Sequence, residues 1–179
     1  MANFDPALYG PVFAELVQGA RLRSLDAGSP EETARLSLEA LSLDAAFAHA
    51  KVVDPEMARC CLSGVWLMHD FLNESHTISQ GIATSSGSFW HGIMHRREGD
   101  FSNAKYWFRK VGDHPVYGPL AEEAREFGFA ADAEWDPLGF VDACQSAVSR
   151  GGSEAAICQR VQQLEWELLF DSCYSAAVS

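Results

Sequence analysis

Residues 54–79, DPEMARCCLSGVWLMHDFLNESHTIS, decide the fold class of this chain. Asp54 followed by Pro55 is a helix start signal, because the aspartate side chain accepts hydrogen bonds from free backbone amides and proline has no amide hydrogen to lose there. Apolar residues then recur at 4-3-4 spacing from Cys61 to Leu72, and others widen this stripe almost all round. The segment is therefore predicted to form one long helix in the middle of the fold.

Helix start and stop signals of the same kind punctuate the rest of the chain. The clearest is Ser29-Pro30-Glu31-Glu32, in which the serine hydroxyl and the Glu32 carboxylate can each satisfy a free backbone amide. The further helices predicted from these signals span about 11–24, 30–49, 88–98, 101–112, 119–127, 137–149 and the stretch after Ser153. Alternating β-branched runs are absent from the sequence. The sequence predicts an all-α chain that folds as a single-domain orthogonal or layered helical bundle over residues 1–179.

Composition and charge narrow the class of protein. The 179 residues are 47% apolar and 21% charged, which is typical of a globular domain with one sizeable core. The net charge of −12 disfavours nucleic acids and anionic membranes as partners, since an acidic surface repels phosphate groups. The sequence shows no secretory signal and no apolar run near the ~18 residues that a bilayer span requires, so we expect a soluble cytoplasmic protein. Five cysteines without CxxC spacing indicate free, buried thiols.

Residues 88–115, SFWHGIMHRREGDFSNAKYWFRKVGDHP, have the pattern of two helices that pack closely across a short turn. The small residues allow the helices to approach, and an aromatic ring fills the gap between them. The residues that carry this pattern are Gly92, Gly99-Asp100-Phe101, Ala104, Phe108, Val111 and Pro115. The segment resembles a single tetratricopeptide-type unit, and the resemblance implies an antiparallel helical hairpin. The chain contains no second copy at the period of 34 residues that is typical of such repeats.

Polar and aromatic residues gather in the same region. The octapeptide from 90 to 97, WHGIMHRR, is similar to the core of an uncharacterised bacterial protein family, a likeness that implies no particular activity. Five of the six histidines fall between residues 69 and 114, and residues 91–114 contain five basic and three acidic side chains. This part of an otherwise acidic chain is therefore cationic, and we expect the functional site there.

The first functional hypothesis is a binding or interaction module. Arginine guanidinium groups can hold a carboxylate or phosphate through paired hydrogen bonds, aromatic rings can stack on a ligand, and histidine can transfer a proton near pH 7. The pocket is predicted to take an anionic small ligand or a peptide end. Its predicted residues are His76, Trp90, His91, His95, Arg96, Arg97, Tyr106 and Arg109.

A second hypothesis is a metal- or histidine-dependent enzyme that uses His76, His91 and His95 with Asp70 or Glu74. His91 and His95 are four residues apart and share one helix face, and Asp70 and Glu74 have the same spacing on the helix before them. If the two helices pack antiparallel, these four side chains could ligate a divalent metal such as zinc, iron or manganese. Alternatively, the two histidines are buried at the helix seam without a cofactor, where they bond to Asp70, Glu74 or backbone carbonyls.

A third hypothesis assigns the chain a structural role as an oligomer subunit. The last helix carries an apolar stripe that includes Trp166 and Phe170. Such a stripe forms either part of the core or the face of a homodimer. Under the dimer interpretation, a charged residue at either position should abolish the dimer.

Overall fold

The chain is built from helices, which confirms the predicted all-α class. The computed structural model describes residues 4–18, 22–129 and 134–178, and within these ranges every regular element is helical. The elements are η1 (Pro6–Tyr9), α1 (Gly10–Val17), η2 (Glu32–Ala34), α2 (Arg35–Glu39), α3 (Leu43–Ala46), α4 (Pro55–Met68), α5 (Leu72–Ser79), α6 (Ser85–Glu98), α7 (Phe101–Val111), α8 (Tyr117–Glu126), α9 (Pro137–Arg150) and α10 (Gly152–Val178).

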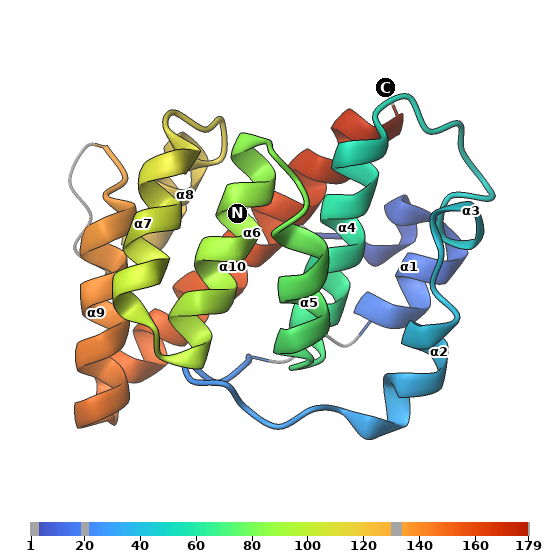
Figure 1. Ribbon diagram of the computed structural model, residues 1–179. Coiled ribbons are helices and arrows are strands. Elements are labelled where there is room, and N and C mark those ends of the chain that lie inside the picture. The colour runs from blue at the N-terminus through green and yellow to red at the C-terminus, as the bar shows by residue number, and fades with distance from the viewer. Residues whose placement is uncertain (1–3, 19–21, 130–133, 179) are drawn as a thin grey trace.

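The helices form the layered bundle that the sequence predicts. Helices α4, α5, α6, α7 and α9 stand side by side in one layer, in which α6 packs against α4, α5 and α7 (Figure 1). The long helix α10 crosses behind this layer and packs against α4, α8 and α9. Helix α6 is the most enclosed element, because every residue from 86 to 97 is buried. Arg96 and Arg97, two of the five basic residues of the cationic segment, therefore lie in the interior.

Short-range start signals are confirmed at the N-termini of η1 and α4. The Asp5 side chain accepts from the amide of Ala7 at 3.0 Å, and the Asp54 side chain accepts from two amides in the first turn of α4. At the start of α9, Asp136 accepts from the amide of Leu138 at 2.9 Å. Each carboxylate satisfies backbone donors that the helix itself leaves free.

The prediction of one helix from 54 to 79 is wrong, because the chain turns at Asp70. The amide of Asp70 donates to the carbonyl of Leu67 at 3.2 Å, and the amide of Phe71 donates to that of Trp66 at 3.1 Å. These two bonds make a Schellman motif, which requires a left-handed residue just after the helix end. Asp70 takes that conformation with φ = 64°, and it is the non-glycine residue with positive φ among the described residues. Helix α5 therefore starts in a new direction.

The predicted helix over 30–49 is replaced by three short pieces, η2, α2 and α3. The capping box does not form at Ser29, since the Glu32 amide donates to the carbonyl of Pro30 and the Glu32 carboxylate accepts from Arg35. The neighbouring Glu31 amide makes a tertiary contact instead, and donates to the carbonyl of His69 at 3.0 Å. The first predicted helix also ends early, at Val17.

Helices α6 and α7 form the predicted hairpin. Gly99 ends α6 in the left-handed region with φ = 88°, a conformation that glycine adopts without a Cβ clash. A Cβ atom at Gly92 would lie 3.0 Å from the ring of Phe108, so the two helices touch where the sequence has its small residue. Membership of the tetratricopeptide family stays a prediction.

The apolar stripe of α10 belongs to the core. Trp166 and Phe170 are buried, their rings stack at 5.0 Å, and the indole of Trp166 donates to the carbonyl of Gly64 in α4. The predicted dimer face through these two residues is therefore wrong. No helix within the described ranges is both long and apolar enough to cross a membrane.

Candidate functional site

The first of the three predicted ligand-binding arginines is used inside the protein. Arg96 is fully buried and donates to both carboxylate oxygens of Glu165 on α10, at 3.2 and 2.5 Å. Its guanidinium group also lies over the ring of Phe140, 4.6 Å from the ring centroid. The ion pair therefore joins α6 to α10 and leaves no clamp for an external anion.

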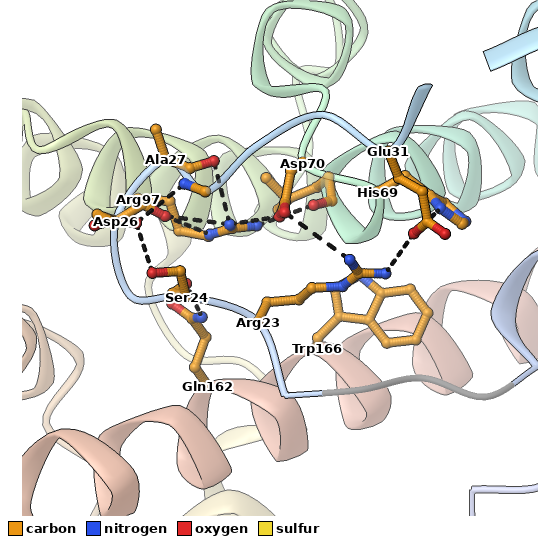
Figure 2. A network of polar contacts seen from close by, with 12 residues as sticks. Arg23, Ser24, Asp26, Ala27, Glu31, His69, Asp70, Arg97, Gln162 and Trp166 are labelled. Carbon is orange, nitrogen blue, oxygen red and sulfur yellow. Dashed lines mark hydrogen bonds and ion pairs between the residues drawn. The ribbon is translucent and has the colours of Figure 1, made fainter. Parts of the chain in front are cut away.

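Arg97 is used in the same way in a second network (Figure 2). Its Nη2 donates to the Asp70 carboxylate at 2.6 Å, and its other hydrogen bonds go to backbone carbonyls. Gly28 lies close to this ion pair, since a Cβ atom at position 28 would lie 2.7 Å from an Asp70 carboxylate oxygen. Arg23 adds a second positive charge at 3.9 Å from the same carboxylate. Asp70 thus balances the charge of two arginines.

Two predicted sets of site residues must be corrected. Asp70 faces Arg97, and Glu74 lies 3.6 Å from Arg35, so neither carboxylate joins His91 and His95 as a metal ligand.

The predicted ligand pocket must also be corrected. Arg96 and Arg97 are bonded inside the protein, and Trp90 is fully buried, where it packs against Gly64 and Trp166. Tyr106 and Arg109 are exposed on α7.

The structure instead brings three imidazoles together. His76 on α5 and His91 and His95 on α6 each present a ring nitrogen, and these three atoms all lie within 4.8 Å of one another. The ring centroid of His91 lies 4.7 Å from that of His76 and 4.6 Å from that of His95. His91 and His95 are buried, and His76 is half-buried. We call these three residues the histidine cluster.

Hydrogen bonds orient both histidines of α6. Nδ1 of His95 lies 2.5 Å from the Glu98 carboxylate, which only accepts, so this nitrogen carries the proton. Nε2 keeps its lone pair, which lies 3.1 Å from the side-chain nitrogen of Asn103. Nδ1 of His91 lies 2.9 Å from the hydroxyl of Ser79, which itself donates to the carbonyl of His76. His91 therefore donates through Nδ1 and also keeps its Nε2 lone pair.

Burial holds His91 neutral. Loss of solvent, together with positive charge on His95, His76 and Lys110, lowers the pKa of this imidazole from 6.5 to about 3. Trp107 covers the ring at 4.2 Å, and the Lys110 ammonium lies over Trp107. Neutral imidazole is the form that ligates metal ions.

A second group of close ligand atoms joins His95 to Glu98 and Asp100. Asp100 already serves as the N-cap of α7, where it accepts from the amide of Asn103 at 3.1 Å. Glu98 already accepts from Nδ1 of His95. The histidine cluster is therefore the better candidate of the two.

The sequence hypothesis of a metal- or histidine-dependent enzyme grouped His76, His91 and His95 with Asp70 or Glu74, and the structure brings together the histidines without these two carboxylates. A continuous helix would have put Asp70 and Glu74 opposite α6, whereas the turn at Asp70 puts His76 there. Ser79, which orients His91, carried no sequence signal at all.

Comparisons of the chain with protein-family models, curated proteins and solved structures find no match. The chemistry of the site is therefore taken from its residues. Imidazole nitrogen is a good ligand for zinc, copper, iron and nickel. Three convergent imidazoles, oriented by a carboxylate and a hydroxyl, have the form of a metal centre with one open coordination position.

Proposed function

We propose that the protein binds one divalent transition metal ion, of which Zn²⁺ fits best, through His76, His91 and His95. The observation that carries this proposal is the convergence of the three ring nitrogens within 4.8 Å. Zinc accepts an all-nitrogen set without the geometric preferences of copper or nickel, and three protein ligands leave a fourth position for water or substrate.

Small movements complete the centre. Bonds of about 2 Å in tetrahedral geometry place the ligand atoms about 3.3 Å apart. His76 is only half-buried, so its ring can rotate toward the two fixed rings of α6. The metal replaces the hydrogen bond that Asn103 makes to Nε2 of His95.

The surroundings support the ligands. The carboxylate of Glu98 bonds to the outer nitrogen of His95, an arrangement that fixes the ring and makes it more basic. Protein residues that hydrogen-bond a ligand typically contribute about 10–100-fold to metal affinity.

The test is a titration of the chelator-treated full chain with Zn²⁺ and with Co²⁺. Calorimetry should show one site, and the Co²⁺ form should absorb in the visible range as tetrahedral sites do. His76→Gln removes a half-buried ligand with little risk to the fold, and it should weaken binding by more than about 100-fold, beyond the effect of an outer residue. Glu98→Gln should weaken it by about 10–100-fold.

His49→Gln is the matched control. His49 is bonded to Tyr174 at 2.7 Å and belongs to neither group of close ligand atoms in the described residues. This variant should bind like the wild type. Absence of stoichiometric binding, or equal affinity in wild type and His76→Gln, would reject the proposal.

A further inference from the structure

Two cysteines on neighbouring helices form a pair that is separate from the proposed metal site. Cys144 lies on α9 and Cys158 on α10, and their thiols are hydrogen-bonded to each other. We call these two residues the thiol pair. The other three cysteines, at positions 60, 61 and 173, are fully buried on α4 and α10.

Only one member of the thiol pair reaches a cavity. A cavity of about 350 Å³ opens between α9, α10 and the segment after α8, and Cys158 contributes to its wall. Phe129, Ala143 and Ile157 give this cavity an apolar side, and Arg150 and Glu154 are exposed polar residues of its lining. Cys144 is not part of the lining and is fully buried. A small reactant can therefore meet Cys158 first.

The surroundings of the two sulfurs give them different roles. The hydrogen bond from Cys144 lowers the pKa of Cys158. Burial opposes this shift, as does the charge of Glu154, while the nearby Arg96 guanidinium adds to it, and the net shift is downward. Burial raises the pKa of Cys144. Because the thiolate is the nucleophile, Cys158 is the sulfur that attacks the oxidant, and Cys144 is the resolving sulfur that then attacks Cys158. By contrast, burial raises the pKa of Cys61, and a hydrogen bond to Cys173 together with burial raises that of Cys60.

We propose that Cys158 and Cys144 form a redox-active dithiol, which a small hydroperoxide entering the cavity between α9 and α10 oxidises to a disulfide. The inference stands apart from metal binding, since it uses none of the histidines. The proposed oxidation takes place at a second site in the molecule, the cavity between α9 and α10.

The reaction proceeds in two balanced steps. The Cys158 thiolate attacks one peroxide oxygen, an S–O bond forms as the O–O bond breaks, and the departing alkoxide takes up the proton that the Cys158 thiol released. The Cys144 sulfur then attacks the sulfur of the sulfenic acid, an S–S bond forms as the S–O bond breaks, and the hydroxide leaves as water with the Cys144 proton. The two sulfurs lose two electrons in total, and the peroxide gains them.

The experiment uses the full chain, stripped of metal, with hydrogen peroxide as the probe near neutral pH. Peptide mapping of the wild type should show a Cys144–Cys158 cross-link and a mass loss of two hydrogen atoms. Cys144→Ser should stop at the sulfenic acid on Cys158, which a dimedone trap labels. Cys158→Ser should give no cross-link and no trapped product at Cys144.

A measurement on the wild type alone keeps the test independent of how the variants fold. Alkylation with iodoacetamide, followed residue by residue, should modify Cys158 at least about tenfold faster than Cys60, Cys61 or Cys173. Equal rates at these sites, or peroxide products spread over all five cysteines, would overturn the proposal. Since no metal is present in this assay, failure here leaves the metal proposal to be judged by its own titration.

Discussion

At the scale of single residues, Asp70 shows how a tertiary contact can hold an unfavourable backbone. A left-handed conformation costs a non-glycine residue about 1–3 kcal/mol. Asp70 adopts it, and its carboxylate meets the buried guanidinium of Arg97 at 2.6 Å with Arg23 nearby. The ion pair compensates for the strain and fixes the point at which α4 ends.

Replacement of the charge alone tests this balance. Asp70→Asn keeps a side chain that tolerates the left-handed region, but it leaves Arg97 buried without its counter-charge. We expect the free energy of unfolding in urea to fall by about 3 kcal/mol. Glu32→Gln is the control, because Glu32 pairs with Arg35 at the same distance of 2.6 Å on the surface. That variant should lose much less stability than Asp70→Asn, because solvent screens an exposed pair, and equal losses in the two variants would contradict the account.

At the scale of elements, α6 shows how a polar helix becomes the centre of a bundle. Its buried stretch contains two histidines and two arginines, and each finds partners on a different neighbour: α5, the turn after α4, α10 or its own last turn. Buried polar groups are tolerated when hydrogen-bonded and costly when not. Helix α6 is therefore positioned by its polar pairs as much as by its apolar residues.

The contact of α6 with α7 gives a prediction at this scale. A Cβ at position 92 would lie 3.0–3.2 Å from three atoms of the Phe108 ring, so Gly92→Ala forces the ring or the helices apart. We expect a loss of about 1–3 kcal/mol in the free energy of unfolding. The helix propensity of alanine offsets only part of this loss.

Gly118→Ala in α8 is the matched control for this packing effect. A Cβ at that helical position would meet no atom within 4 Å. This variant should be neutral or more stable by up to about 1 kcal/mol, since alanine favours the helix. Chemical denaturation of the two variants side by side decides the matter, and a Gly92→Ala protein as stable as wild type would refute close packing.

At the scale of the whole molecule, buried neutral histidine makes stability depend on pH. His114 accepts from the amide of Val116 through Nδ1 at 3.3 Å, and its Nε2 lies 3.0 Å from the Ser86 hydroxyl. The imidazole is thus held as one neutral tautomer. Burial lowers the pKa of His114 from 6.5 to about 4.

The sign of the pH effect follows from linkage. Between pH 6.5 and 4 the unfolded chain binds a proton at His114 that the folded chain does not, so acidification destabilises the fold. Its share is about 3 kcal/mol between pH 7 and 4. His114→Asn keeps an acceptor for the Val116 amide. Between pH 7 and 4, the free energy of unfolding of this variant should fall by about 3 kcal/mol less than that of the wild type. If the free energy of unfolding fell by the same amount in wild type and variant between pH 7 and 4, this role of His114 would be disproved.

The sequence by itself determined the all-α class, several helix starts and the hairpin of α6 and α7. These features depend on neighbours close in the chain: the carboxylates of Asp5, Asp54 and Asp136 cap amides two or three residues away, and Gly99 turns the backbone locally. Interactions of this range can be read from spacing alone.

Only the tertiary structure decided the break at Asp70 and the members of the candidate site. A local pattern predicts a continuous helix there, but the choice of Asp70 as a partner for Arg97 depends on residues 27 positions apart. The same choice turns α5 so that His76, and not Glu74, faces His91 and His95. Buried charges must find counter-charges wherever the packing brings them, and sequence spacing carries no information about which partner that will be.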